Sequence, residues 1–529
     1  MTSRTQESPA VGWLLLMPAA LGMLITLLLP TVLTAGFSLR AGELVGPSEF
    51  AGLDNYGRLL TDATFWPALG FTLSVTILPL LVALVVAPLL AFALDRGGTV
   101  VRRAGRVLLS LSLVAFSPAA VAVSWLRGLQ PDAGGLAALA RQLGEAQSAP
   151  GAFRLIAAAA TFGVVCALAV MAFLPALRGG TVTPAMLTVG VIVALATVAA
   201  GLQLFTLGLV LTGGGPMDST QTLALLQYTY TFRAARLGMG ASIATVTGVV
   251  LGVLGVAATV VAIVSRMRLT YDAGTVPRRT SSAGVAVGVV ALAVAAAAIL
   301  VTTWPWLSAL LTPGRTAAGP SVHLNTWLPA LAGALVSVGV AYLAALGIGA
   351  LRPLGRRSEW LLLPFAPWLF AGTGPLSIAN WNTMRGLGLV DTFAALVPPL
   401  LVSVPALVVL TLLCKGLAER NTGDLLTGVV RPSLPMAGVL VVAVTLVNAQ
   451  DLLWPLLVAQ RTDLATAPVA QMTAAGQFEG AAVDAALATP LVAIVLALAA
   501  AVAAQLLYLD RLALTVGRGT GARRRRRDA

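Results

Sequence analysis

Apolar residues fill most of this chain in long runs that are separated by short polar loops. Twelve runs reach roughly 20 residues or more, the length that an α-helix needs to cross a hydrocarbon core of about 30 Å. The alternating runs of about ten residues that are typical of membrane β-barrels do not occur in the sequence. The pattern therefore predicts an all-α polytopic membrane protein with about twelve transmembrane helices.

The basic segment Arg266–Arg279 divides the expected helices into two groups of six. The expected spans are 11–37, 66–94, 106–128, 153–177, 185–211, 239–265, 283–304, 326–351, 358–380, 393–414, 434–455 and 483–507. We expect four parts: a first six-helix half (1–265), a basic cytoplasmic hinge (266–282), a second six-helix half (283–517) and an arginine-rich cytoplasmic tail (518–529). Because each half has an even number of spans, both halves share one orientation and would form a parallel repeat. FWPALGFTLSV from Phe65 and TWLPALAGALVSV from Thr326 are similar starts of the second helix in each half.

Composition and charge support a membrane location. The chain has 529 residues, of which 58% are hydrophobic and 10% charged, too apolar for soluble domains. The net charge of +13 suggests nucleic-acid binding, but the arginines lie in short loops and in the tail, so membrane topology explains them better. One side of the predicted topology holds 23 of the 33 basic residues. We therefore expect a multi-pass protein of the inner (plasma) membrane with the hinge and both termini in the cytoplasm.

Motifs for enzymatic chemistry are absent from the sequence. There is no Walker-type phosphate loop, no nucleophile elbow and no zinc-binding helix. Cys166 and Cys414 fall in expected helices and form neither a disulfide framework nor a metal-binding motif, so we expect them to be small core residues. His323 is expected in a loop or at the membrane interface. The sequence thus predicts neither an enzyme nor a metal or cofactor site.

A few polar side chains interrupt the apolar runs and are candidates for a solute path. Three are amides, which suit sugar hydroxyls because they both donate and accept hydrogen bonds, and two are aromatic neighbours for stacking on a pyranose. The last is an ionisable group at membrane depth. These candidates are Gln203, Asn448, Gln450, Phe205, Trp454 and Asp451. For the amides the alternative is helix-to-helix hydrogen bonding, and for Asp451 it is the outer water interface. If the path lies between the halves, Gln203 and Asn448 should face one another across it.

Several motifs resemble the two-subunit permeases of bacterial carbohydrate ABC importers, of the maltose and glycerol-phosphate type. In the first half these are FAGLDNYGRLLTDATFWPALGFTLSVT (Phe50–Thr76), FSPAAVAVSWLRGL (Phe116–Leu129) and LTGGGPMDSTQTLALLQYTY (Leu211–Tyr230). In the second half they are LGLVDTFAALVPP (Leu387–Pro399) and VNAQDLLWPLLVA (Val447–Ala459). The resemblance implies two fused type-I permease halves that form the translocation path for a small solute, a sugar. It also implies ABC ATPase subunits and an extracytoplasmic lipoprotein solute-binding protein as partners.

The loops that such permeases use to contact the ATPase depart from the family pattern. The first, Leu177–Pro184, is too short for the family's docking helix, and the second, Lys415–Pro435, lacks the EAA-x-x-x-G register. Arg178, Glu419, Asn421 and Thr422 are the candidate coupling residues. We expect asymmetric coupling, mainly through the second loop. The alternatives are a permease-derived scaffold or regulatory partner without ATP coupling, and a secondary transporter.

Overall fold

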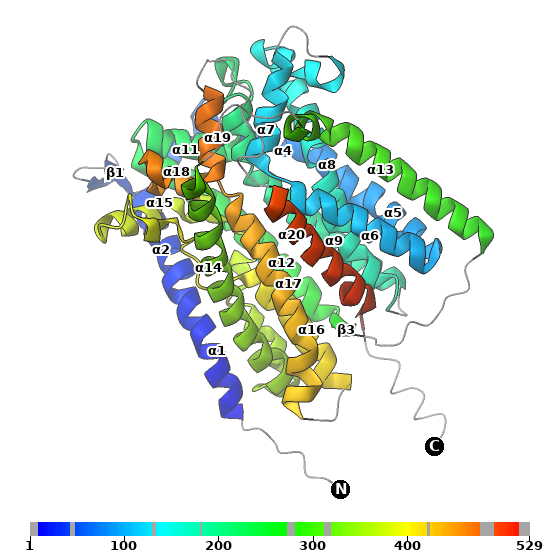
Figure 1. Cartoon of the computed structure of the whole chain (residues 1–529). Helices are drawn as coiled ribbons and strands as arrows, with labels where there is room; N and C mark the ends of the chain where they lie inside the picture. The colour runs from blue at the N-terminus through cyan, green and yellow to red at the C-terminus, as the bar shows by residue number, and fades with distance from the viewer. Residues whose placement is uncertain are drawn as a thin grey trace, which may run out of the picture.

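The computed structural model describes residues 9–42, 48–129, 134–179, 182–271, 281–311, 319–420, 424–476 and 491–517. It is a bundle of helices, most of which run along one common direction (Figure 1). The helices before the hinge are α1 (Pro9–Met23), α2 (Leu29–Ser38), α3 (Asp54–Leu60), α4 (Phe65–Leu81), α5 (Ala87–Arg96), α6 (Gly98–Ala115), α7 (Pro118–Leu126), α8 (Ala149–Ala176), α9 (Val182–Leu202), α10 (Thr206–Leu211), α11 (Leu223–Tyr228) and α12 (Leu237–Val264).

The helices after the hinge are α13 (Ser282–Leu311), α14 (Pro320–Ala345), α15 (Thr373–Gly386), α16 (Val404–Arg420), α17 (Arg431–Ala449), α18 (Leu453–Val458), α19 (Ala467–Gly476) and α20 (Leu491–Leu507). The strands are β1 (Arg40–Gly42), β2 (Ser48–Phe50), β3 (Arg268–Tyr271) and β4 (Leu512–Thr515). Short π-helical turns are η1 (Leu24–Leu28), η2 (Val82–Val86), η6 (Thr229–Arg233), η7 (Leu346–Leu351) and η11 (Leu426–Val430). Short 3-10 segments are η3 (Arg127–Leu129), η4 (Gly135–Gly144), η5 (Pro216–Asp218), η8 (Gly355–Leu362), η9 (Ala366–Trp368), η10 (Phe393–Leu396), η12 (Thr462–Leu464) and η14 (Leu509–Arg511).

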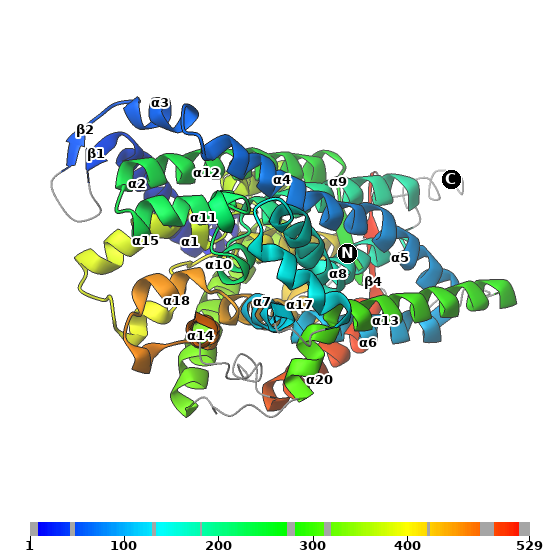
Figure 2. The same ribbon diagram turned by 90° about the horizontal axis from the view of Figure 1, so that it is seen from above.

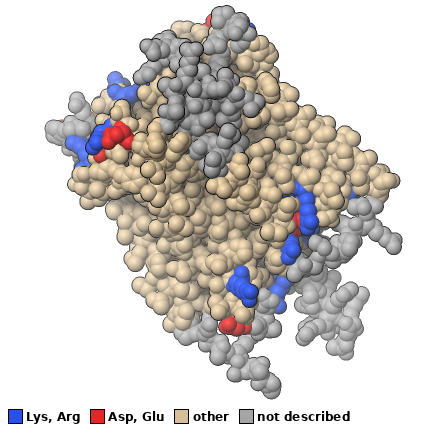
Figure 3. Space-filling model, viewed as in Figure 1, with Lys and Arg blue, Asp and Glu red and all other residues tan. Residues whose placement is uncertain are grey.

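Within the described residues, eight helical segments are long and apolar enough to cross a membrane. The pair α6 and α7, bent by 77° just before Pro118, makes a ninth if it counts as one span. Much of the surface in Figure 3 is uncharged, and the charged side chains gather toward its edges and lower end. The expectation of an all-α polytopic membrane protein is therefore confirmed, with eight or nine candidate spans among the described residues.

Three of the twelve expected spans are not among these nine. Over 358–380 the chain forms η8, η9 and the start of α15 instead of one helix, because Pro364 and Pro367 cannot continue helical hydrogen bonding. Over 393–414 it forms η10 and then α16, which begins only after Pro398 and Pro399. The third expected span, 483–507, overlaps α20, and its residues 483–490 lie outside the described part.

The irregular segment 355–372 packs against the regular helices α12 and α2. η9 packs on α12, where a Cβ at Gly255 would overlap the carbonyl oxygen of Ala366. Trp368 Nε1 donates a hydrogen bond of 3.0 Å to Thr31 Oγ1 of α2. Non-helical backbone at membrane depth is tolerated where protein buries it, and these contacts supply that burial.

The two halves exchange their first helices. α1 packs against α14 and η7 of the second half, whereas α13 packs against α5, α6 and α8 of the first (Figures 1 and 2). Glycines permit both close contacts. A Cβ on Gly347 would lie 2.6 Å from the carbonyl oxygen of Gly12, and a Cβ on Gly288 would lie 2.8 Å from Gly97 Cα. The sequence halves are therefore intertwined rather than separate bodies.

The predicted hinge is partly a strand. β3 pairs antiparallel with β4, in the register Arg268↔Thr515 to Tyr271↔Leu512. One face of this two-stranded ribbon lies against the α8–α9 connection, where a Cβ on Gly179 would overlap the carbonyl oxygen of Leu514. β3 also packs on α16, where a Cβ on Gly416 would overlap the carbonyl oxygen of Leu269. The remaining hinge residues, 272–280, lie outside the described part.

Candidate functional site

A small chamber is lined by residues at the C-terminal ends of α9 and α17. It encloses about 170 Å³ and is walled by both halves. Its polar and aromatic wall residues include Gln203, Phe205, Gln227, Tyr228, Ser377 and Asp451. The first four come from α9 to α11, and the last two come from α15 and from the connection between α17 and α18. We call this space the interhalf chamber.

Gln203 joins the halves directly. Its Nε2 donates to the carbonyl oxygens of Ala199 at 2.9 Å and Phe370 at 2.8 Å, and its Oε1 accepts from the N–H of Gly372 at 2.6 Å. Both amide protons are thus used inside the protein. Gln203 fastens the segment before α15 to the end of α9, as in the helix-to-helix alternative, although it also contributes to the chamber wall.

Gln227 makes a second link of the same kind. Its Nε2 donates to the carbonyl oxygen of Gly374 at 2.8 Å and lies 3.4 Å from Ser377 Oγ. Because two amides of the first half hold the backbone around residues 370–374, this part of the second half is positioned at the chamber by the first. Both halves therefore contribute to the wall of the chamber, and a separation of the halves would break these hydrogen bonds and open the wall.

Aromatic rings form the other side of the chamber. Phe205 and Tyr228 make an edge-to-face pair with centroids 5.2 Å apart, and Phe232 follows at 5.8 Å from Tyr228. Trp381 of α15 extends this row at 5.8 Å from Phe232. Such pairs hold the rings in fixed orientations. Phe205, a path candidate from the sequence, lines the chamber.

Asp451 supplies the carboxylate of the chamber. It follows the end of α17, accepts a hydrogen bond of 3.0 Å from the N–H of Leu453 and is also bonded by the Thr373 side chain. In α12, the buried hydroxyl Thr247 Oγ1 belongs to the same wall and has no hydrogen-bond partner within the described segments. The chamber thus combines a carboxylate, hydroxyls and rings.

The other predicted path residues lie elsewhere. Trp454 is 1% exposed and donates from Nε1 to the carbonyl oxygen of Ala395 at 2.8 Å, so it is a core residue. Asn448 Nδ2 donates to the carbonyl oxygen of Ala330 at 3.2 Å, within its own half, and does not belong to the chamber wall. Gln450 lines a separate, larger cavity. Gln203 and Asp451 therefore both line the chamber, and Asn448 does not.

Of the predicted coupling residues, Arg178 and Glu419 are engaged within the chain. Arg178 Nη1 lies 3.7 Å from Asp510 Oδ1, and burial together with the charge of Arg102 lowers the pKa of its guanidinium. Glu419 forms ion pairs with Arg268 of β3 and, at 2.7 Å, with Arg352. Asn421 and Thr422 lie outside the described residues.

The second predicted coupling loop is shorter than expected. α16 continues through Arg420, and Leu426 already begins the helical segment that leads into α17. A separate docking helix over Lys415–Pro435 is therefore not formed by the described residues. The first loop is short as predicted, since α8 ends at Ala176 and α9 begins at Val182.

Sequence reasoning missed Gln227, Tyr228, Thr373 and Ser377. The first two lie in the segment Leu211–Tyr230 that carried part of the family resemblance, so that segment was a usable signal. Thr373 and Ser377 lie within the expected span 358–380, where hydroxyls gave no signal of a chamber. No protein-family model matches the sequence, and no curated protein matches it.

Proposed function

We propose that this chain is the membrane permease of an ABC-type importer and forms the path for a small polar solute, a sugar. The observation that carries the proposal is the interhalf chamber, which is lined by Asp451, Ser377 and Gln227 together with the rings of Phe205 and Tyr228. Sugar hydroxyls need both donors and acceptors, and aromatic rings suit the apolar faces of a pyranose. The motif resemblance to carbohydrate permeases points to the same class.

The size of the chamber fits a closed state of such a path. Sites for drug-sized ligands enclose about 300–1,000 Å³, and the chamber is smaller. A sugar would enter when the two halves separate and would break the bonds of Gln203 and Gln227 to the segment 370–377. Alternating access around a site between two repeats has this consequence.

The proposed path has twelve crossings. Beyond the nine candidate spans, the remaining three would be the irregular run from Gly355 to Gly386, α16 and the segment that ends with α20. α16 has 17 residues, about 26 Å of helix, close to the thickness of the hydrocarbon core. The reciprocal exchange of α1 and α13 is what two parallel repeats related by a pseudo-twofold axis would produce.

Uptake measurements test the proposal. The chain would be expressed with the ABC ATPase and solute-binding proteins of its own genome, and uptake of radiolabelled maltose, glucose and glycerol 3-phosphate would be followed. Asp451→Asn should lower uptake about tenfold or more at an unchanged protein level, because a hydrogen bond to a charged group contributes about 1.5–3 kcal/mol. Asp463→Asn is the control, because Asp463 is exposed in the loop that precedes α19, and it should leave uptake unchanged. Unchanged uptake in both Asp451→Asn and Tyr228→Leu would contradict a path through the chamber.

The β3–β4 ribbon favours a second candidate, a permease-derived scaffold without ATP coupling. The ribbon lies on both regions where an ATPase would dock, at Gly179 and at Gly416. Vesicle assays separate the candidates. Uptake that requires ATP and is blocked by vanadate supports the importer, and uptake that a proton ionophore abolishes without added ATP supports a secondary transporter. No uptake of any tested solute, together with no crosslinking to an ATPase of the same genome, supports the scaffold.

A further inference from the structure

A second, much larger cavity lies between the interhalf chamber and the ribbon. It encloses about 910 Å³ and is bordered by α6, α8 and α9 on one side and by α16, α17 and α20 on the other. Gln450 contributes to its outer end, next to Asp451 of the chamber, and Leu269 and Leu514 of the ribbon contribute to its inner end. Nearly all other wall residues are aliphatic, so water gains few hydrogen bonds there and the cavity favours apolar contents.

Arg106 is the only charged residue of this wall among those described. Its side chain is 1% exposed. Nη1 donates to Gln505 Oε1 at 2.8 Å and Nε lies 3.6 Å from Asp510 Oδ1, but Nη2 has no hydrogen-bond partner in the described part of the chain. A buried guanidinium donor without an acceptor is costly, and guanidinium groups match phosphate geometry.

The surroundings of Arg106 carry an excess of positive charge. Four arginines (Arg102, Arg103, Arg106 and Arg178) surround Asp510, and Asp95 is the second carboxylate, 3.7 Å from Arg102. Among the described residues, four cations against two anions leave an excess of about two positive charges; Arg102 and Arg106 are buried, whereas Arg103 is 42% exposed. An anion in the cavity at Nη2 would reduce this imbalance.

We propose that the cavity binds an anionic phospholipid, with its phosphate at Arg106 and acyl chain along α17 and α20. Two observations point to this occupant. The aliphatic walls favour acyl chains over a sugar or a free anion as the sole ligand. The excess of positive charge around Arg106 favours a lipid with a net negative charge. The arginine distribution places this end at the cytoplasmic leaflet, where anionic phospholipids are concentrated and basic pockets between helices bind their headgroups. The site is independent of the proposed sugar path.

Photolabelling of the purified full-length chain in phosphatidylcholine nanodiscs tests the site. The probe is phosphatidylglycerol with a diazirine near the end of one acyl chain. We expect labelled peptides from α17 and α20. Arg106→Gln should reduce this labelling about tenfold or more, as loss of a charge-assisted hydrogen bond does, and the exposed Arg461→Gln should leave it unchanged.

A cavity-filling pair of variants tests the site without altering the arginine cluster. Ala501 contributes to the cavity wall, whereas Ala503 is exposed on another face of α20. Ala501→Phe should therefore abolish most labelling, and Ala503→Phe should not. If Arg106→Gln fails to fold, this pair decides the outcome alone.

Competition identifies the ligand class. Unlabelled phosphatidylglycerol should displace the probe, and equal amounts of phosphatidylethanolamine, which is zwitterionic, of oleate or of inorganic phosphate should not. Equal competition by phosphatidylethanolamine would overturn the role of Arg106. Equal competition by oleate would overturn the phospholipid, and equal competition by phosphate would indicate a free-anion site. Unchanged labelling in both Ala501→Phe and folded Arg106→Gln would refute the proposal.

Discussion

Asp510→Asn is the substitution for which the structure predicts the largest loss of stability. Asp510 is fully buried and accepts from Arg102 Nε at 2.9 Å, while Arg106 and Arg178 lie within 3.7 Å of the same oxygen. Asparagine keeps the shape of the side chain but removes its charge. Several arginines would then remain buried without their main counter-ion.

The expected magnitude is large for a single atom exchange. Removing one partner of a buried ion pair costs about 3–5 kcal/mol, because the remaining charge stays out of water. The matched control is Asp463→Asn, whose bidentate pair with Arg461 is 58–61% exposed. Exposed pairs contribute about 0–1 kcal/mol, so the same chemical change should be almost silent there.

Thermal unfolding of the full chain in detergent, followed by far-UV circular dichroism, measures both variants. Burial alone would raise the pKa of Asp510, but the hydrogen bond from Arg102 and the charges of Arg102, Arg106 and Arg178 lower it below its ordinary value. A carboxyl group with a lowered folded-state pKa stabilises fully above its unfolded pKa of about 3.9 and loses that contribution as pH falls through the folded value. The difference between wild type and Asp510→Asn should therefore be constant from about pH 5 to 9.

Two results would refute this reasoning. One is an Asp510→Asn variant as stable as Asp463→Asn, which would mean that water reaches the arginine cluster. The other is a wild-type advantage that changes between pH 6 and 8, which would assign the effect to another titrating group. High salt should weaken the Arg461 pair and spare the Asp510 cluster, because buried charges are screened little.

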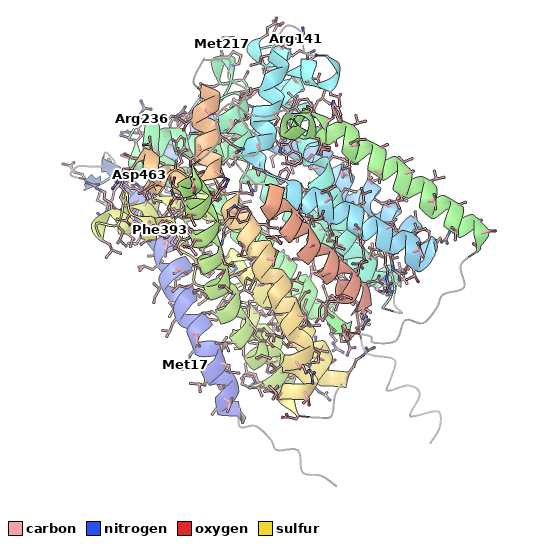
Figure 4. The ribbon with its side chains drawn as sticks, viewed as in Figure 1. Met17, Arg141, Met217, Arg236, Phe393 and Asp463 are labelled. Carbon is pink, nitrogen blue, oxygen red and sulfur yellow. The ribbon has the colours of Figure 1, made fainter. Side chains whose placement is uncertain are left out.

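Three further predictions test the fold. Gly255→Ala should destabilise the chain in the same unfolding assay, because its Cβ would overlap the carbonyl oxygen of Ala366, whereas Gly190→Ala, with nothing within 4 Å, should be neutral. In a chain whose native cysteines are replaced, the double variant Thr270→Cys with Ala513→Cys, two residues paired in the ribbon, should form a disulfide under mild oxidation and change the gel mobility of the chain. The control double variant, Thr270→Cys with Ala467→Cys, should not. Alkaline phosphatase fused after Gly517 or within the hinge should be inactive, and fused at Met217 it should be active. Met217 and Arg141 lie at the end of the molecule opposite the start of α1 and the end of α20 (Figures 1 and 4). Activity at Gly517 would contradict the topology.

Hydropathy predicted the long regular helices because each is a continuous apolar run, and it also predicted the short connection between α8 and α9. It did not predict the irregular segment 355–372, because a hydropathy average is insensitive to Pro364 and Pro367. Phe205 and Asp451 were recognised as path candidates from residue type alone. The Arg102–Asp510 bond joins residues 408 positions apart, and no local pattern indicates such a contact.

The ribbon changes how the two halves can be driven. Sequence reasoning expected a strong ATPase contact on the second half and a weak one on the first, but β4 covers Gly179 of the first half and β3 covers Gly416 of the second. Any motion that separates the α8–α9 connection from α16 must therefore part the strands or lift the ribbon off one of these surfaces. Parting them breaks a ladder of four residue pairs, whose backbone hydrogen bonds contribute about 0.5–1.5 kcal/mol each. We infer that a partner acting on the ribbon would move both halves together. Coupling through this element would then be symmetric, even though the described residues of neither loop form a separate docking helix.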